Sequence, residues 1–273
     1  MIELHAHTTA SDGMLSPEEL VRTAAGRGVR TLAITDHDTT GAFGSALKEA
    51  AAAQGVRVIA GIETSASVGT DDVHLLGLGI DPESAELQQL IRAMRSRRQE
   101  RAKAILDRLG ALGVGVDWES VEAQAGGVVT RPHLASALVD GGHVPDIRSA
   151  FDLYLARGAG AFVRLQAPSA EEWIAAIRAA GGVSVLAHPG HWTPHRTVLA
   201  LMEQGLDAVE VRHPSHDVDL EVYYQDLADR EGLMCGGGSD FHGRFEEEAE
   251  RLGQFQPPPP RLERLMDPVQ IWA

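Results

Sequence analysis

The sequence predicts an α/β domain of barrel type that is interrupted by a helical insertion. Over residues 1–80, and again from about residue 160, short apolar segments alternate with helical segments, a spacing typical of parallel βαβ units. Between these regions the chain is helical and glycine-rich, without a convincing strand. We therefore expect a barrel formed by residues 1–98 and 161–273, and a small, mainly helical insertion at residues 99–160.

The elements of the first half follow from apolar runs and capping signals. The predicted strands are residues 2–5, 31–35, 56–62 and 73–80. Ser16-Pro-Glu-Glu19 is a capping box with Pro17 at the first helical position, which predicts a helix to about Gly26. A second helix is expected over residues 41–54. Helices of this length between strands indicate parallel pairing.

The second half begins with a long charged helical stretch at residues 84–109. Ser169-Ala-Glu-Glu172 is another capping box, and strands are predicted at residues 183–187, 208–211 and 233–236. The proline run at residues 257–260 is incompatible with a helix interior or a central strand, so we expect an extended arm there.

Composition excludes several classes of function. The chain has 273 residues and a net charge of −15, which disfavours long nucleic acids unless positive charge is concentrated locally. No apolar run reaches the roughly 18 residues of a membrane span, and the acidic start Met-Ile-Glu-Leu-His is unlike a signal peptide. The single cysteine, Cys235, excludes an intrachain disulfide. We expect a cytoplasmic protein without a membrane partner.

The histidines carry the functional prediction, because six of the twelve lie within predicted strands or at their carboxyl ends. In a parallel barrel these ends converge on one face, where active sites are built. Three carboxylates occupy similar positions. The nine candidate metal ligands are His5, His7, Asp12, His37, Glu63, His74, His188, Asp240 and His242.

This set of side chains indicates a cluster of divalent ions. A lone His-x-His pair such as His5-Ala-His7 is more often a pair of surface histidines, but nine such groups at successive strand ends are not explained that way. Nine ligands exceed the four of a tetrahedral ion and suit two or three ions, with Glu63 as the expected bridge. Imidazole and carboxylate without thiolate suit manganese, and also iron or zinc. The local positive charge would favour a phosphate ester. Asp36 or Asp38 is expected to orient a ligand imidazole.

These motifs, in this order, resemble those of the polymerase-and-histidinol-phosphatase (PHP) phosphoesterases over residues 1–80 and about 160–245. The resemblance implies a distorted (β/α)7 TIM-like barrel with three metal ions. It assigns His5, His7, Glu63 and Asp240 to one ion. A second ion takes Glu63, His74 and His188, and a third takes Asp12, His37 and His242.

Two segments of the insertion resemble the branch of nucleotide phosphatases: Arg-x-x-Arg-Ala at residues 98–102 and Thr-Arg-Pro-His at residues 130–133. The resemblance makes Arg131 and His133 candidate substrate contacts, with a helix cap as the alternative for this segment. Arg101 and Lys103 are further candidates, with a solvated helix face as the alternative. Trp192, near His188, is a candidate lid on a base.

The function expected from this resemblance is a metal-dependent phosphatase that removes the 3′-phosphate of nucleoside 3′,5′-bisphosphates, such as adenosine 3′,5′-bisphosphate to AMP. A metal-bridging hydroxide would attack phosphorus, without a protein nucleophile. The alternatives are a 5′-3′ exonuclease on short RNA or DNA oligonucleotides, a histidinol-phosphate phosphatase and a non-catalytic metal-binding scaffold. An amidohydrolase is disfavoured because Lys48 and Lys103 lie away from the strand ends where a carboxylated lysine would be needed.

Overall fold

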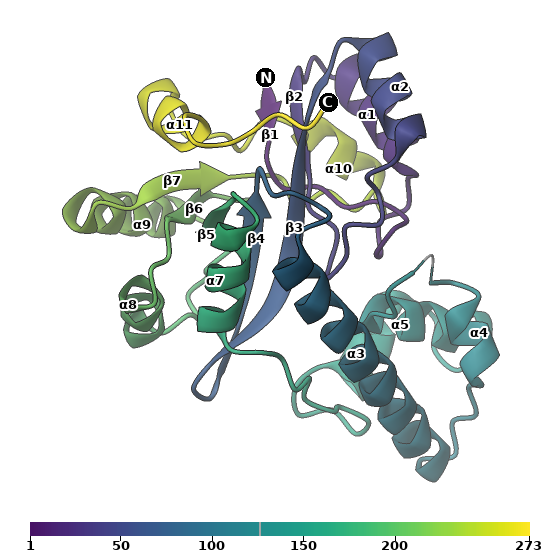
Figure 1. The fold of residues 1–273 in the computed structure, drawn as a ribbon. Coiled ribbons are helices and arrows are strands. Elements are labelled where there is room, and N and C mark those ends of the chain that lie inside the picture. Colours follow the sequence, from purple (N-terminus) through teal and green to yellow (C-terminus); the bar gives the residue numbers. More distant parts are fainter. Residues whose placement is uncertain (126) are drawn as a thin grey trace.

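Seven strands form one sheet in the order β1-β2-β3-β4-β5-β6-β7, and the sheet curls into a nearly closed barrel (Figure 1). This computed structural model describes residues 1–125 and 127–273. The strands are β1 (Ile2–Glu3), β2 (Thr31–Ile34), β3 (Arg57–Val68), β4 (Asp71–Leu78), β5 (Val183–Leu186), β6 (Ala208–Arg212) and β7 (Met234–Gly237). The predicted α/β barrel is confirmed.

The barrel closes where the chain leaves β1 and β7. The backbone N–H of His7 donates to the carbonyl of Phe241 at 2.8 Å, and Ala6 and Phe241 form an isolated parallel bridge. Gly238 lies so close to β1 that a Cβ added to it would be 2.4 Å from the Cβ of His5. Only glycine therefore allows the two ends to meet at this point.

The predicted parallel pairing is wrong for β4, which pairs antiparallel with both β3 and β5. A parallel return needs a crossover connection of a dozen or more residues. Here only Gly69 and Thr70 separate the two strands, and Gly69 has a φ of +58°, as a tight hairpin turn requires. β3 also runs further than predicted, to Val68, so that the hairpin extends below the rest of the barrel in Figure 1.

Helices cover the outside of the barrel. They are α1 (Pro17–Gly26), α2 (Ser45–Gln54), α7 (Ala170–Ala179), α8 (His195–Glu203), α9 (Val218–Glu231) and α10 (Glu246–Arg251). The capping boxes predicted at Ser16 and Ser169 are both present. Trp173 of α7 and Tyr224 of α9 are fully buried in the main core. None of the described helices combines the length and apolarity needed to cross a bilayer.

The extended arm predicted at the proline run is wrong for its second half. Pro259 and Pro260 begin helix α11 (Pro259–Met266). Its Leu265 is buried in one hydrophobic cluster with Leu4 and Val185 of the barrel. Proline has no N–H, but the first N–H groups of a helix have no intrahelical acceptor in any case, so proline is tolerated in the first turn.

Residues 85–155 form a helical unit beside the barrel. Its elements are α3 (Ala85–Ala111), α4 (Trp118–Glu122), α5 (Arg131–Asp140), α6 (Ile147–Ala150) and the π-helix η1 (Phe151–Leu155). A separate hydrophobic cluster, with Leu109, Leu134 and Leu138 buried in it, holds its outer part together. The first turns of α3, with Leu87 and Met94, are instead buried in the main core. Figure 1 shows α3 leaving the barrel as one continuous helix, so the predicted boundary at residue 98 lies within it.

Candidate metal centre

The site begins at the end of β1, where His5 and His7 occupy alternate positions of an extended segment. Alternate residues of such a segment point to the same side, and both imidazoles are fully buried. The backbone N–H of His5 donates to the carboxylate of Glu3 at 3.0 Å, and the N–H of His7 is held by Phe241. The barrel closure thus fixes the two rings in place.

A first group of four ligand atoms lies around these rings. His5 Nε2 lies 3.4 Å from Glu63 Oε2 and 3.3 Å from Asp240 Oδ1. His7 Nε2 lies 3.2 Å and 3.1 Å from the same two oxygens. Metal–ligand bonds of about 2.0–2.1 Å in a tetrahedral site would place neighbouring ligand atoms about 3.3–3.4 Å apart. The spacing of the four atoms therefore fits one enclosed cation.

Glu63 presents its other oxygen to two more imidazoles. Oε1 lies 2.7 Å from His74 Nδ1 and 2.9 Å from His188 Nε2. His74 projects from the middle of β4, and His188 follows β5. Oε2 faces His5 and His7 and also lies 3.0 Å from Nδ1 of His37, while Oε1 faces the second pair, so the carboxylate stands between groups of ligand atoms. This is the position that the predicted bridging ligand would need.

A third group contains Asp12, His37 and His242. One ligand atom from each of them and one from His7 all lie within 4.8 Å of one another. Asp12 Oδ1 lies 3.4 Å from His242 Nε2 and 3.9 Å from His37 Nε2. The structure therefore brings all nine predicted ligands together, in three overlapping groups that share His7 or Glu63.

The electrostatics of the centre favour bound cations. Burial alone would raise the pKa of Glu63, but the surrounding imidazoles, His37 foremost, hold it well below its usual value. Burial alone would lower the pKa of His7, yet Asp240 and Glu63 raise it to about 10. Within the described residues, several buried polar atoms have no hydrogen-bond partner, an arrangement that costs free energy unless a ligand satisfies them. They include His5 Nε2, Asp12 Oδ1, His37 Nδ1 and Glu63 Oε2.

The carboxylate of Asp12 is oriented by two residues whose role the sequence did not indicate. Oδ2 accepts hydrogen bonds from Arg244 at 3.0 Å and from the hydroxyl of Thr130 at 3.3 Å. Oδ1 is thereby left facing the imidazoles. Arg244 lies 232 positions away in the sequence, and no local pattern reveals such a contact.

The acids beside His37 support the loops of the site instead of a ligand ring. Asp36 accepts hydrogen bonds from the backbone of Thr8 at 2.7 Å and from the hydroxyl of Ser11 at 2.6 Å. Asp38 pairs with Arg98 at 2.6 Å. Outside the nine predicted ligands, Glu210 is a carboxylate that contacts a candidate ligand imidazole, that of His5. The available signal was an acidic residue between two valines of the strand Ala208–Arg212.

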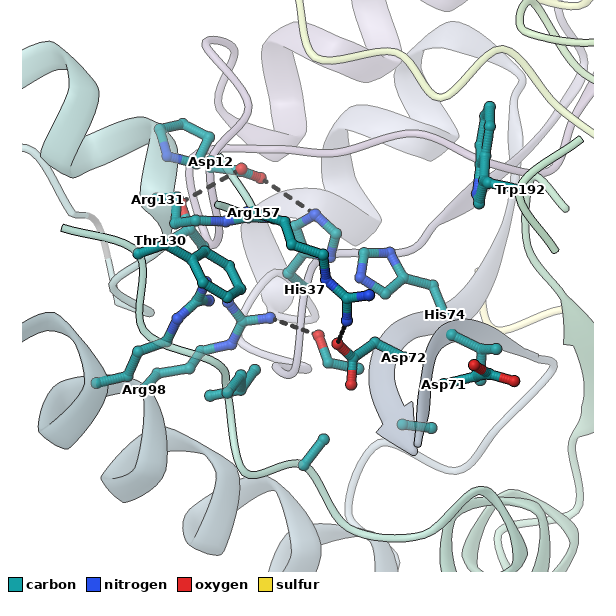
Figure 2. Close-up of a pocket in the computed structure, with 18 of the residues that line it drawn as sticks. Asp12, His37, Asp71, Asp72, His74, Arg98, Thr130, Arg131, Arg157 and Trp192 are labelled. Atoms are coloured by element: carbon teal, nitrogen blue, oxygen red, sulfur yellow. Dashed lines mark hydrogen bonds and ion pairs between the residues drawn. The ribbon is translucent and has the colours of Figure 1, made fainter. Parts of the chain in front are cut away.

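A cavity of about 730 Å³ opens over the centre. Asp12, His37, His74 and His242 form part of its lining, and the insertion contributes Arg98, Arg101, Thr130, Arg131, Phe151 and Arg157. Figure 2 shows Arg98 and Arg131 on one side of His37 and His74, and Trp192 on the other. A substrate in this cavity would meet the metal ligands and the arginines at the same time.

Comparison with known proteins places the chain in a family. The family model of the PHP domain matches residues 3–184, two thirds of the chain. The chain belongs to the PHP family.

Individual PHP relatives extend the match over most of the chain. The 3′,5′-nucleoside bisphosphate phosphatase of Chromobacterium violaceum is 38% identical over 252 residues, which cover 90% of this chain and 88% of the relative. The 5′-3′ exoribonuclease of Salmonella typhimurium is 37% identical, covering 88% and 84%. A structure described as a metal-dependent phosphoesterase from Bifidobacterium adolescentis superposes with a TM-score of 0.90 at 29% identity, covering 99% of this chain and 97% of that one.

The four candidate substrate contacts of this PHP protein fall into two pairs. Arg101 and Arg131 line the cavity. Lys103 is exposed and lies over the ring of Trp118, 5.2 Å from its centroid. His133 Nδ1 accepts the backbone N–H of Thr130 at 3.1 Å and so caps α5, the alternative noted for this segment. Neither Lys103 nor His133 is among the described residues that line the cavity.

Arg101 and Arg131 are an unusual pair of cations. Burial first, and then the neighbouring guanidinium groups of Arg131 and Arg98, lower the pKa of Arg101 to about 9. Burial and Arg98 also lower the pKa of Arg131. Arg101 donates to the carbonyl of Val163 at 2.8 Å, but in the part of the chain that the structure describes neither arginine forms an ion pair. An anion entering the cavity would relieve this repulsion.

Proposed function

We propose that this protein removes the 3′-phosphate from nucleoside 3′,5′-bisphosphates. The observation that carries the proposal is the pair Arg101 and Arg131, which lines the same cavity as His37, His74 and His242. Neither forms an ion pair among the described residues, although the charge of Asp72 in the same cavity acts on both guanidinium groups. A substrate with two phosphates could place one phosphate at the metal ligands and the other at Arg101 and Arg131. The relative from Chromobacterium violaceum, named for this activity, supports the choice.

The residues fit three divalent ions, with manganese as the first choice and iron or zinc as alternatives. His5, His7, Glu63 and Asp240 would hold the first ion. Glu63, His74 and His188 would hold the second, and Asp12, His37 and His242 the third. When bound, such ions supply charge neutralisation of the phosphate oxygens and lower the pKa of bound water.

The protein's own contribution is to position the substrate. Arg98 is anchored by Asp38 and by the hydroxyl of Ser65 at 3.0 Å, so its guanidinium is held rigidly at the cavity wall. Arg101 and Arg131 would bind the 5′-phosphate by bidentate hydrogen bonds. Binding energy from this remote phosphate would align the 3′-phosphate for reaction, which affects kcat as well as KM.

Trp192 suits the nucleoside base. Its side chain lines the cavity, yet 69% of the residue is exposed. The ring lies against Gly190, where an added Cβ would come within 2.3 Å of it, so the backbone supports one face and leaves the other for a ligand. A purine stacked on this face would bury apolar surface on both partners.

A second candidate function is 5′-3′ exonuclease activity on short oligonucleotides. Arg157 lines the same cavity, is bound to Asp72 at 3.0 Å, and provides a cation in addition to Arg131. An additional phosphodiester group would lie near it. The Salmonella relative, named as an exoribonuclease, favours this alternative.

A substrate panel tests the proposal. Phosphate release is measured with manganese-loaded protein on adenosine 3′,5′-bisphosphate, on 3′-AMP and 5′-AMP, on a 5′-phosphorylated trinucleotide and on histidinol phosphate, and nucleotide products are separated by chromatography. We expect the bisphosphate to give the highest kcat/KM, with 5′-AMP as product. A higher value on the trinucleotide, with release of mononucleotides, would replace the phosphatase by the exonuclease.

A further inference from the structure

Glu210 is a fully buried carboxylate in the middle of β6 that lies outside the nine predicted ligands. Its two oxygens make different contacts. Oε1 lies 3.1 Å from Nδ1 of His5, and Oε2 accepts the backbone N–H of His188 at 2.5 Å. One side chain on β6 therefore touches two candidate ligands that come from β1 and from the end of β5.

The contact with His5 decides which ring nitrogen faces the metal centre. A carboxylate can only accept, so Nδ1 carries the hydrogen and donates it to Glu210. The lone pair of the neutral ring is then on Nε2. That atom faces Glu63 Oε2 and Asp240 Oδ1, at 3.4 Å and 3.3 Å. Glu210 thus presets the tautomer and the ring orientation that metal ligation requires.

The contact with His188 holds an unfavourable backbone conformation. His188 has a φ of +31°, in a region that side chains other than glycine rarely adopt. Such a conformation costs free energy and persists only where the surroundings impose it. The bond from its N–H to Glu210 Oε2 ties the residue down, and its Nε2 then lies 2.9 Å from Glu63 Oε1.

We propose that Glu210 is a positioning residue of the metal centre, which prepares His5 for one ion and His188 for another while binding neither ion itself. This inference rests on the metal centre of the proposed function. A role as a ligand is disfavoured because both oxygens already accept N–H groups. His213 lies close to His5 and Glu210. Its Nδ1 accepts the N–H of Ser215 at 3.1 Å, and its buried Nε2 lies 3.6 Å from Asp240 Oδ2 without a hydrogen-bond partner among the described residues.

Glutamine at position 210 keeps the size of the side chain but changes its hydrogen-bonding capacity. The carboxylate accepts two N–H groups, one at each oxygen, whereas an amide has one accepting oxygen and one NH₂ group that can only donate. Glu210→Gln must therefore lose either the N–H donation from His188 or the one from His5 Nδ1. In the second case an amide NH₂ could hold His5 only in the opposite tautomer, with the hydrogen on Nε2. Although it conserves the size of the side chain, Glu210→Gln is expected to weaken the binding of at least one of the two ions.

Asp207→Asn, at the residue directly before β6, is the matched control. Asp207 Oδ2 accepts both the backbone N–H and the hydroxyl of Ser184, at 3.0 Å and 2.7 Å. Its Oδ1 lies 3.7 Å from Arg178 in a partly exposed ion pair, which contributes little to stability. An asparagine oxygen can take over both bonds. The control therefore removes a carboxylate next to β6 without changing any contact with a candidate ligand.

The test measures Mn²⁺ affinity and stoichiometry by equilibrium dialysis with elemental analysis, alongside thermal unfolding of the metal-free proteins. We expect Glu210→Gln to weaken Mn²⁺ binding roughly 10- to 100-fold, the range found for such outer-sphere partners, and Asp207→Asn to bind as the wild type does. Metal-free Glu210→Gln should melt well above the temperature of the dialysis, so that unfolding does not explain its weaker Mn²⁺ binding.

Unchanged affinity in a folded Glu210→Gln variant would overturn the inference. So would loss of one whole ion at saturating Mn²⁺, because that result would make Glu210 a ligand. If the glutamine variant does not fold, Glu210→Asp takes its place, because aspartate keeps two accepting oxygens on a shorter side chain. Weaker Mn²⁺ binding is again expected, and wild-type affinity would overturn the proposal. Failure of the wild-type protein itself to bind Mn²⁺ would instead refute the proposed metal centre.

Discussion

Arg98 on α3 and Asp38, the residue after His37, form a buried ion pair with Arg98 Nε 2.6 Å from Asp38 Oδ2. Asp38 has a φ of +49° and is completely buried. Its other oxygen accepts the backbone N–H of Ser65 at 3.0 Å. The pair thus fastens the long helix of the insertion to the loop that carries a candidate metal ligand.

Arg98→Ala should destabilise the protein strongly, because it leaves the Asp38 carboxylate buried without its partner. Breaking a buried pair of this kind typically costs about 3–5 kcal/mol. Chemical denaturation of the metal-free protein measures the loss. Arg97→Ala is the control, since Arg97 is partly exposed and contacts only the carbonyl of Gln166 among the interactions described. A loss below about 1 kcal/mol for Arg98→Ala would contradict this account of the pair.

The overlapping ligand groups lead us to expect close to three metal ions per chain in active protein. Nine ligand side chains, with Glu63 between two groups, are too many for one ion. Elemental analysis after manganese supplementation, normalised to the protein concentration, gives the number. A fully active preparation with a single ion per chain would refute the three-ion site.

Glu63→Gln should lower turnover by about 100-fold or more. A loss of this size is typical when an active site loses one preorganised electrostatic group. The carboxylate faces His5 and His7 with one oxygen and His74 and His188 with the other. Loss of its charge would weaken two ions together. Turnover and thermal unfolding are measured on the same preparation. Activity within a few-fold of the wild type would show that Glu63 is not a bridge.

Arg131→Ala should impair hydrolysis of the bisphosphate and leave the slow hydrolysis of 3′-AMP nearly unchanged. The reason is that Arg131 is proposed to bind the phosphate that does not react. We expect kcat to fall and KM to rise on the bisphosphate. Arg148→Ala, at an insertion arginine whose side chain is 91% exposed, is the control. An equal loss on both substrates would assign Arg131 to the reacting phosphate or to folding.

Metal binding should release protons near pH 7.5, and Mn²⁺ affinity should rise between about pH 6 and pH 9. Asp240 and Glu63 overcome the effect of burial and raise the pKa of metal-free His7 from 6.5 to about 10. Charged His7 therefore stabilises the metal-free protein fully below about pH 6.5, and this contribution is lost as the pH rises through about 10. A metal ion needs the neutral ring, so it displaces the proton. Calorimetry in buffers of different ionisation enthalpy counts the protons, and a release of zero would contradict the shift.

Local sequence determined much of this protein. Alternating apolar and helical segments predicted the barrel, and the capping boxes at Ser16 and Ser169 set helix starts that the structure contains. The convergence of strand ends, which is a property of the barrel topology, was enough to select the nine side chains that meet in the centre. These features depend on residues near in sequence or on a general rule of the fold.

Two departures from the predicted fold come from local geometry: Gly69 allows the tight turn that makes β4 antiparallel, and Pro259 begins a helix where an extended arm was expected. Tertiary structure decided the contacts between distant residues, which no local pattern can encode. Glu210 and Arg244 lie 205 and 232 positions from the residues they orient. Which side chains occupy a common cavity depends on packing between distant elements. For that reason Arg131 lies in the cavity, whereas Lys103 of the same helical unit lies over the ring of Trp118.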